Sequence, residues 1–98
     1  MPRVAGEVKL HELKTWPEPF QAVWEGRKLH EIRTNDRDFR ERDVLNLREF
    51  DPSTQTYSGR QKLMRVTFIT LGGSWGLPGR LCVMSVKPES EFWGGGVE

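Results

Sequence analysis

The sequence has little cysteine, little net charge and no long apolar segment, and each scarcity excludes a class of protein. Its 98 residues include one cysteine, so no disulfide can form within the chain, as is typical of a reducing compartment. No apolar run reaches the length of about 18 residues that a membrane-spanning helix needs. The opening segment, MPRVAGEVKL, has no apolar signal core. We therefore expect a cytoplasmic protein without a membrane partner.

Positive and negative charges nearly cancel. The chain has 15 Lys and Arg against 14 Asp and Glu, a net charge of +1. Without a global basic field, a polyanion such as RNA can bind only through a local patch. Two histidines and one cysteine without ligand-like spacing predict no metal site. The glycine-rich segment 72–79 precedes a predicted strand and not a helix, so it is no phosphate-binding loop. We expect neither a metal nor another cofactor.

The length predicts a single domain over residues 1–98. Its core is expected at about 7–88, and the glycine-rich end, 89–98, is expected to be mobile. A domain of this size has room for a shallow pocket rather than a deep cavity. We expect a monomer or a weak dimer, with a protein partner possible.

Hydrophobic alternation and turn residues predict a mainly β (α+β) fold with one early helix. The predicted strands span 7–14, 28–34, 44–50, 60–71 and 80–87. A sheet of about five to six strands hides its edges by curling into a small barrel. Met64, Val66 and Phe68 are expected to share one face of the fourth strand. The run 80–87 is nearly all apolar, which predicts a buried strand with Cys82 as a small core residue.

The helix is expected to start in the segment TWPEPF. Thr15 and Glu18 have the spacing of a capping box, and Pro17 suits the first helical turn. Phe20 and Val23 then begin an apolar stripe. Gly26 stands at the position where a residue in the left-handed conformation would end the helix. Trp16 and Trp24 flank this helix and are expected in the core or over it as a lid.

The segment GRKLHEIRTNDRDFRERD, residues 26–43, is dense in charge. Such runs are usually solvated, but alternation places Glu31 and Arg33 on one face of a strand, about 7 Å apart. A carboxylate can hold a guanidinium in the orientation for bidentate contact with a phosphate or a base edge. Lys28, Asn35 and Asp36 flank this pair and add a cation, an amide and a carboxylate. The alternative is a plain ion pair that supports the rim of the barrel.

Three further residues have two possible roles each. His11 is expected to be a half-buried strand histidine rather than a catalyst. Asp43 is expected to be a turn residue that opens the third strand. Trp75, in its glycine-rich loop, is either a platform on which a base can stack or a plug for one end of the barrel.

Several motifs together resemble the ASCH domain of the PUA-like superfamily, in a short branch found in phage and bacterial genomes. They are HELKTWPEPFQAVWEGRKLHEIRTNDRDF, VLNLREFD, YSGR, VTFIT and LCVMSV, which cover most of the chain from His11 to Lys87. The resemblance implies a small PUA-like β-barrel with one or two short helices beside a cleft that binds RNA or a nucleotide. The residues that it assigns to this cleft are Lys28, Glu31, Arg33, Asn35, Asp36 and Arg37, joined by His11 and Lys14.

Some ASCH relatives are amidohydrolases that act on acyl-modified cytidines, and the chain departs from their pattern. Leu29 replaces the threonine that follows their lysine, and the 71–80 connection is too short for the insert that carries their glutamate. Arg42 also stands where the branch has a glycine. We expect a binding module rather than an enzyme; the alternatives are a hydrolase with Lys28 as base and Glu31 as its partner, and a phage protein-interaction module that uses the Trp75 loop.

Overall fold

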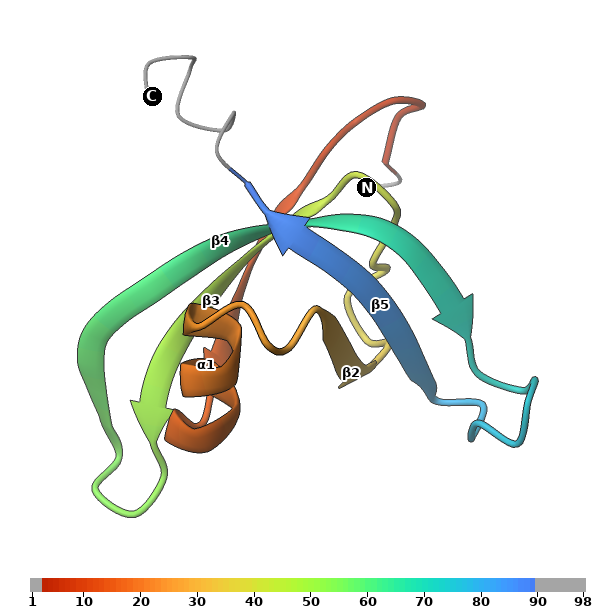
Figure 1. Ribbon diagram of the computed structural model, residues 1–98. Coiled ribbons are helices and arrows are strands. Elements are labelled where there is room, and N and C mark those ends of the chain that lie inside the picture. The colour runs from red at the N-terminus through yellow and green to blue at the C-terminus, as the bar shows by residue number, and fades with distance from the viewer. Residues whose placement is uncertain (1–2, 90–98) are drawn as a thin grey trace.

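All five strands of the computed structural model join one sheet, which curls into a half-barrel over a single helix (Figure 1). The structure describes residues 3–89. The elements are β1 (Leu10–Thr15), α1 (Pro17–Trp24), β2 (His30–Thr34), β3 (Val44–Asp51), β4 (Thr56–Leu71) and β5 (Leu81–Pro88). The prediction of a mainly β domain is confirmed. The predicted tail, 89–98, lies outside the described residues apart from Glu89.

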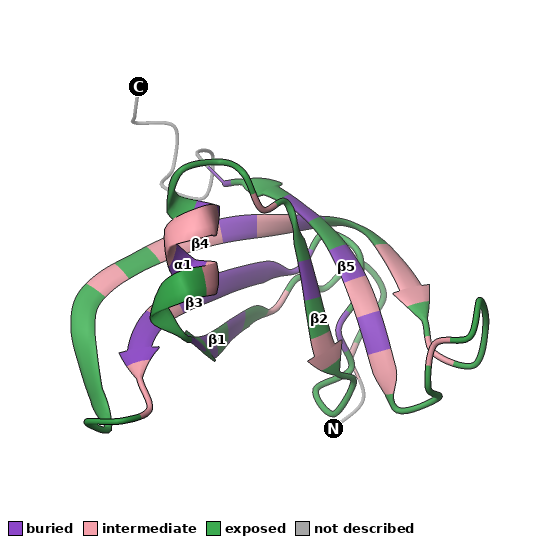
Figure 2. Ribbon diagram, turned by 60° about the horizontal axis from the view of Figure 1, so that its bottom comes forward, coloured by how far each residue is buried: buried purple, intermediate pink, exposed green. Residues whose placement is uncertain are grey.

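The sheet has the strand order β1-β3-β4-β5-β2, so β1 and β2 are its two edge strands. β1 runs parallel to β3, and the other neighbouring pairs are antiparallel. No backbone ladder joins β1 to β2 within residues 3–89, so the half-barrel stays open between them. Figure 2 shows these two strands and α1 on the same side of the molecule.

The helix begins differently from the prediction. Thr15 is still the last residue of β1, and the N-cap is Trp16, whose backbone is extended and whose side chain makes no capping hydrogen bond. The predicted Thr15–Glu18 capping box is therefore wrong, because the N-cap lies one residue later, at Trp16, and Thr15 belongs to β1. Pro17 does occupy the first turn. Gly26 has a φ of 82°, the left-handed conformation predicted for the helix stop.

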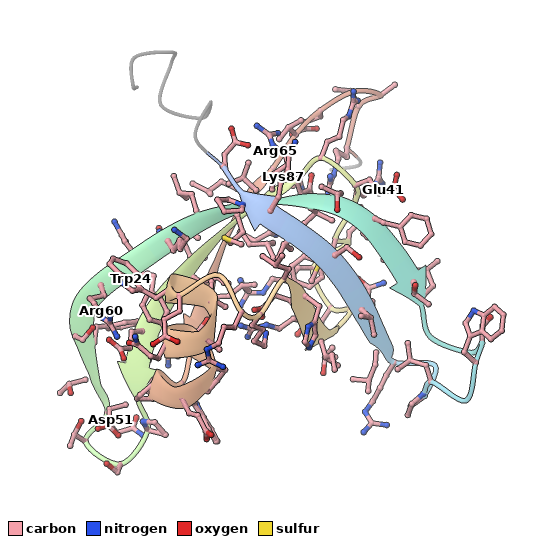
Figure 3. The ribbon with its side chains drawn as sticks, in the orientation of Figure 1. Trp24, Glu41, Asp51, Arg60, Arg65 and Lys87 are labelled. Atoms are coloured by element: carbon pink, nitrogen blue, oxygen red, sulfur yellow. The ribbon has the colours of Figure 1, made fainter. Side chains whose placement is uncertain are left out.

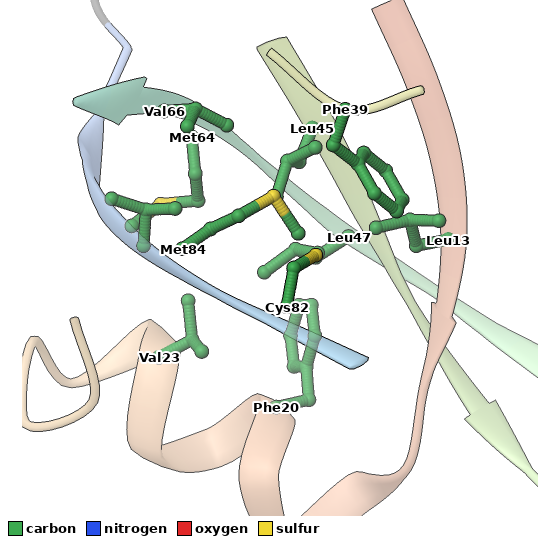
Figure 4. Packing of buried hydrophobic residues seen from close by; sticks show 11 residues of the cluster. Leu13, Phe20, Val23, Phe39, Leu45, Leu47, Met64, Val66, Cys82 and Met84 are labelled. Atoms are coloured by element: carbon green, nitrogen blue, oxygen red, sulfur yellow. The ribbon is translucent and has the colours of Figure 1, made fainter. Parts of the chain in front are cut away.

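The core is made by alternate residues of the sheet and by the buried face of α1 (Figure 4). Phe20 and Val23 point from the helix toward the sulfur-rich middle of the sheet. Cys82 is buried there as predicted, and burial raises the pKa of its thiol, followed by the charge of Asp36. A buried thiol with a raised pKa is a packing residue, not a nucleophile. Trp24 is 46% exposed and Trp16 59%, so neither belongs to the core.

A β-bulge in β4 changes which side chains face the core. The register with β5 shifts between Val66 and Phe68, so one extra residue of β4 is inserted there. Phe68 consequently turns to the outer face, where it is 58% exposed, and Ile69 packs against the core in its place. The prediction that Met64, Val66 and Phe68 share one face is correct for the first two and wrong for Phe68. β5 alternates between buried and more exposed residues, so its predicted burial holds for one of its two faces only.

Asp43 is a fully buried carboxylate that ties three segments together. It accepts hydrogen bonds from Arg3 Nη1 at 2.7 Å and from the backbone N–H groups of Lys9 at 3.1 Å and Arg40 at 3.0 Å. His11 Nε2 lies 2.8 Å from its other side. Burial alone would raise the pKa of Asp43, but hydrogen bonds from His11, Lys9, Arg3 and Arg40 outweigh it and lower that pKa. Asp43 precedes β3 as predicted, and in addition it anchors the N-terminal segment.

Replacing Asp43 with asparagine should destabilise the protein strongly. Asp43→Asn removes the close counter-charge of the Arg3 guanidinium, whose side chain is 1% exposed, and leaves only the Asp38 carboxylate at 3.9 Å. Removing one member of a buried ion pair costs about 3–5 kcal/mol in the free energy of unfolding. Urea denaturation at neutral pH measures this loss. Asp38→Asn is the matched control, since Asp38 is 59% exposed at its side chain, and equal unfolding midpoints for the two variants would contradict this account.

The Asp43→Asn variant and the parent protein should differ in how their stability responds to acid. Because the folded-state pKa of Asp43 lies below its unfolded value, its contribution to stability is present above the unfolded pKa and is lost as pH falls through the folded pKa. The unfolding free energy of the Asp43→Asn variant should therefore decline less on acidification than that of the parent protein.

Candidate functional site

β2 carries its charged side chains inward and its apolar side chain outward. Glu31 is 3% exposed, whereas its neighbour Ile32 is 56% exposed. Strand alternation places Arg33 on the same inner face as Glu31, as predicted. A buried carboxylate beside an exposed isoleucine is the reverse of what core packing favours. This local sequence is therefore arranged for a polar site and not for the core.

Glu31 lies between two cations, and both of its carboxylate oxygens are used. Lys28 Nζ donates to Oε2 at 2.8 Å, and Arg33 Nε donates to Oε1 at 3.1 Å. Lys28 also donates to the carbonyl oxygen of His30 at 2.6 Å. The predicted Glu31–Arg33 pair is confirmed, and Lys28 joins it. The two cations are only 21% and 24% exposed at their side chains, so they are held in place yet still reach solvent.

Side chains bridge the gap between the edge strands β1 and β2, which we call the seam. Arg33 Nη2, from β2, donates to Thr15 Oγ1 of β1 at 3.3 Å. Arg37 Nη1, from the loop after β2, donates to the carbonyl oxygen of Glu12 in β1 at 2.8 Å. Edge strands leave backbone groups unpaired, and here an arginine satisfies one of them. The seam is therefore closed by arginine side chains instead of a backbone ladder.

An open pocket lies at the seam, and we call it the seam pocket. It has a volume of about 280 Å³, near the lower end of the roughly 300–1,000 Å³ of small-molecule sites. Its lining residues come from β1, α1 and β2: Lys14, Thr15, Trp16, Pro19, Lys28, His30, Glu31, Ile32 and Arg33. Trp16 lies at its edge with an exposed ring, which fits the lid role and not the core role predicted for it.

A second hollow, the basic hollow, adjoins the seam pocket and has a volume of about 430 Å³. Its lining residues are Glu12, Leu13, Lys14, Arg33, Arg37, Arg48 and Tyr57. Lys14 and Arg33 line both spaces, so the two are continuous at these side chains. Together they present five Lys and Arg side chains against Glu12 and Glu31, on a chain whose net charge is only +1. This is a local basic patch of the kind that a polyanion requires.

The structure brings together most of the predicted site residues. Lys14, Lys28, Glu31 and Arg33 line the seam pocket, and Arg37 lines the basic hollow. Sequence reasoning missed Thr15, Arg48 and Tyr57. Lys14 pairs with Arg48 in the parallel β1–β3 register, so a strand-pairing prediction could have found Arg48.

Four other predicted site residues line neither space. His11 is buried between Asp43 and the ring of Phe39, whose centroid lies 4.7 Å from its own. The side chain of Asn35 accepts a hydrogen bond from the N–H of Phe39 at 3.4 Å, so it shapes the loop after β2. Asp36 is exposed in the same loop. The fourth, Trp75, is described next.

Trp75 is exposed, which excludes one of its two predicted roles. Its side chain is 92% exposed at the tip of the β4–β5 loop, so it does not plug the barrel. The loop is closed by hydrogen bonds between Gly73 N and Leu77 O at 2.8 Å and between Leu77 N and Ser74 O at 2.9 Å. Trp75 also has a φ of 56°, a conformation that costs a large L residue energy. The loop lies away from α1 in Figure 1, outside the seam.

A larger hollow, of about 600 Å³, lies on the other side of the sheet. Glu41, Arg65 and Lys87 lie beside it, at the far side from α1 in Figure 3. Arg65 Nε donates to Glu89 Oε1 at 2.8 Å, and Arg65 Nη1 donates to the carbonyl oxygen of Arg42 at 2.7 Å. Arg42 has a left-handed φ of 77°, a conformation that favours glycine. Acids and bases are mixed here, and the seam presents the stronger basic patch.

A double-mutant cycle should show that Glu31 and Arg33 act as a unit. Glu31→Gln alone leaves two cations around a buried amide and should lower the free energy of unfolding by about 1–3 kcal/mol. Combined with Arg33→Gln, the losses should be less than additive, with a coupling of about 1 kcal/mol. Urea denaturation of the four proteins gives the coupling. Glu12→Gln is the control for the loss of an exposed carboxylate, since Glu12 is 60% exposed and lies 3.7 Å from Arg48. Strictly additive losses for Glu31→Gln and Arg33→Gln would contradict the pairing.

Comparison with known proteins places the whole site inside one family. Residues 10–86 match the family model with the description "Domain of unknown function (DUF3850)", which covers every element from β1 almost to the end of β5. No curated protein matches the chain. The matched segment contains all residues that line the seam pocket and the basic hollow. The chain belongs to the family described as Domain of unknown function (DUF3850).

Proposed function

We propose that the protein is a small RNA- or nucleotide-binding module of the ASCH/PUA-like type and that the seam pocket is its binding site. The observation that carries this proposal is the convergence of Lys28, Glu31 and Arg33 on one open pocket. These three side chains come from the six-residue stretch 28–33, whose other residues are exposed. Their convergence supports a ligand that offers anionic groups together with a polar edge.

The chemistry of the pocket suits a nucleotide. Lys28 and Arg33 supply N–H donors for phosphate oxygens or for acceptors on a base edge. Glu31 fixes the direction of the Arg33 guanidinium through the 3.1 Å contact with Nε, and Nη2 reaches Thr15 Oγ1 at 3.3 Å. The Nη1 group has no partner among the described residues and can donate to a ligand. Trp16, 59% exposed at the edge of the pocket, offers an aromatic face on which a base can stack.

The resemblance to ASCH domains supports the same assignment. Its G-x-K-x-x-E-x-R segment corresponds here to Gly26, Lys28, Glu31 and Arg33, and the last three line the pocket. A half-barrel with one helix beside the pocket agrees with the architecture that the resemblance implies. The residues of this motif therefore have a common location, which an ordinary charged loop would not require.

The geometry favours binding over hydrolysis. A lysine acts as a general base only in its neutral form. Lys28 Nζ already donates hydrogen bonds to the Glu31 carboxylate at 2.8 Å and to the carbonyl oxygen of His30 at 2.6 Å. Lys28 is therefore better suited to donate hydrogen bonds to a ligand than to remove a proton from water in an amidohydrolase reaction.

The Trp75 loop favours a second candidate function, a protein-interaction module. An exposed tryptophan on a hydrogen-bonded loop is the kind of residue that dominates the energy of protein interfaces. Its 92% exposure and left-handed backbone persist in a loop that the surrounding hydrogen bonds hold closed. This surface is separate from the seam pocket, so a variant at Trp75 distinguishes the two functions.

Binding of single-stranded RNA should depend on Arg33. With a fluorescein-labelled random RNA pool of about 12 nucleotides, fluorescence anisotropy should show salt-sensitive binding by the parent protein. Arg33→Ala should weaken that binding by about tenfold or more, since a charge-assisted contact contributes about 1.5–3 kcal/mol.

Two control variants locate the effect. Arg27→Ala removes a cation that pairs with Glu25 outside the pocket, and it should bind like the parent protein. Trp75→Ala should also bind normally. Absence of any salt-sensitive affinity in the parent protein would overturn the proposed function, and a loss of RNA binding in Trp75→Ala alone would move the site to the loop.

A further inference from the structure

The basic hollow contains two cations that do not line the seam pocket, in addition to two that line both spaces. Lys14 and Arg33 are shared with the seam pocket, but Arg37 and Arg48 line only the hollow. They come from different segments: Arg37 from the loop after β2 and Arg48 from β3. Like charges repel, so a fold gains nothing by gathering them unless an anion lies among them.

Two of these cations are positioned by a pair of aromatic rings. Lys14 Nζ lies 4.4 Å from the centroid of the Phe50 ring, and the Arg48 guanidinium lies 4.0 Å from that of Tyr57. The two rings contact each other edge to face, with centroids 5.0 Å apart. A guanidinium stacked on a ring keeps the N–H groups around its edge available for hydrogen bonds. The rings thus hold Lys14 and Arg48 in place without neutralising them.

Lys14, Arg37 and Arg48 have no carboxylate within hydrogen-bonding distance in the part of the chain that the structure describes. Arg48 Nη1 lies 3.7 Å from Glu12 Oε1, beyond hydrogen-bonding distance, and Arg37 bonds to a backbone carbonyl. No carboxylate contact involves Lys14 within residues 3–89.

Arginines outside the hollow are commonly paired. Arg27, Arg40 and Arg60 each have a carboxylate oxygen within 3.0 Å. The positive charge of the hollow is therefore a local property and not a general feature of this surface.

We propose that the basic hollow is a phosphate subsite, with Lys14, Arg37 and Arg48 as its donors. This inference rests on the proposed function, because the hollow is continuous with the seam pocket at Lys14 and Arg33. A base lies in the seam pocket and the phosphate that follows or precedes it lies in the hollow. The ligand is then a phosphorylated nucleotide or a nucleic-acid strand, not a free nucleoside.

The salt dependence of binding tests this subsite directly. Each phosphate contact on a single strand contributes about −0.7 to the slope of log affinity against log salt. With the same labelled RNA pool, Arg37→Gln and Arg48→Gln should each reduce the steepness of that slope by about 0.7 and weaken binding several-fold at low salt. Arg27→Gln removes the same charge outside the hollow and should leave the slope unchanged.

Competition experiments identify the chemistry of the ligand. Nucleoside 5′-monophosphates should displace the RNA pool at lower concentration than the corresponding nucleosides. If monophosphates compete as well as an unlabelled RNA strand, the phosphate subsite serves a free nucleotide. If the strand competes much better, it serves a polymer. Equal competition by nucleosides and monophosphates, or competition by polyglutamate as strong as that by RNA, would overturn the proposal.

The outcomes separate this proposal from the one on which it rests. If the parent protein binds RNA and both glutamine variants keep its affinity and slope, the phosphate subsite is wrong while the seam pocket stands. If the parent protein binds no RNA, both proposals fall. Arg48→Gln loses its stacking on Tyr57, so a folding defect there would leave Arg37→Gln to decide, since its side chain bonds only a backbone carbonyl among the described residues.

Discussion

The meeting of two unpaired strand edges is the constraint on which the rest of the structure depends. β1 and β2 end the sheet order, and neither has a backbone partner on its free side within the described chain. A sheet of five strands can hide such edges by closing completely or by covering them. Here Arg33 and Arg37 reach across to β1 instead. Because the bridges are side chains, the seam stays wide enough for a pocket and carries positive charge.

Two buried carboxylates organise the molecule, and their surroundings give them different roles. Asp43 is bonded by the side chains of Arg3 and His11, which are 1% and 6% exposed, and by two backbone N–H groups. Glu31 is bonded by Lys28 and Arg33, whose side chains are partly exposed to the seam pocket. Asp43 therefore serves the scaffold, since the side chains that bond it are buried with it. Glu31 orients cations that a ligand can contact.

Local pattern was sufficient to predict the elements, and it placed the central pair of the site correctly. Alternation along β2 put Glu31 and Arg33 on one face, and a glycine marked the helix stop at Gly26. The positions of Phe68 and Trp16 were harder, for different reasons. The bulge after Val66 lies in the segment VTFIT, which has no glycine or proline to indicate an extra residue. Only Trp16 separates β1 from the helix, so a capping pattern that includes the last residue of the strand misled the prediction.

The rest of the site depends on contacts between distant segments. Arg48 and Tyr57 joined it only because β1 lies parallel to β3 and β3 pairs with β4. His11 does not belong to the site, because its side chain lies inside the protein against Asp43. Neither the partner of an edge strand nor its direction is encoded in the alternation of a single segment. The sequence of the charged stretch thus predicted what the site contains, while the strand pairing decided which of its neighbours belong to it.

Nuclear magnetic resonance mapping of a short single-stranded RNA onto the folded protein tests the central claim most directly. If the seam is the binding site, backbone amide shifts should move first at residues 14–16 and 28–33, on both sides of the gap. The indole N–H signal of Trp16 should move with them, whereas that of Trp75 should stay fixed. Shift changes confined to the 72–80 loop, or none at the seam under saturating RNA, would contradict this account.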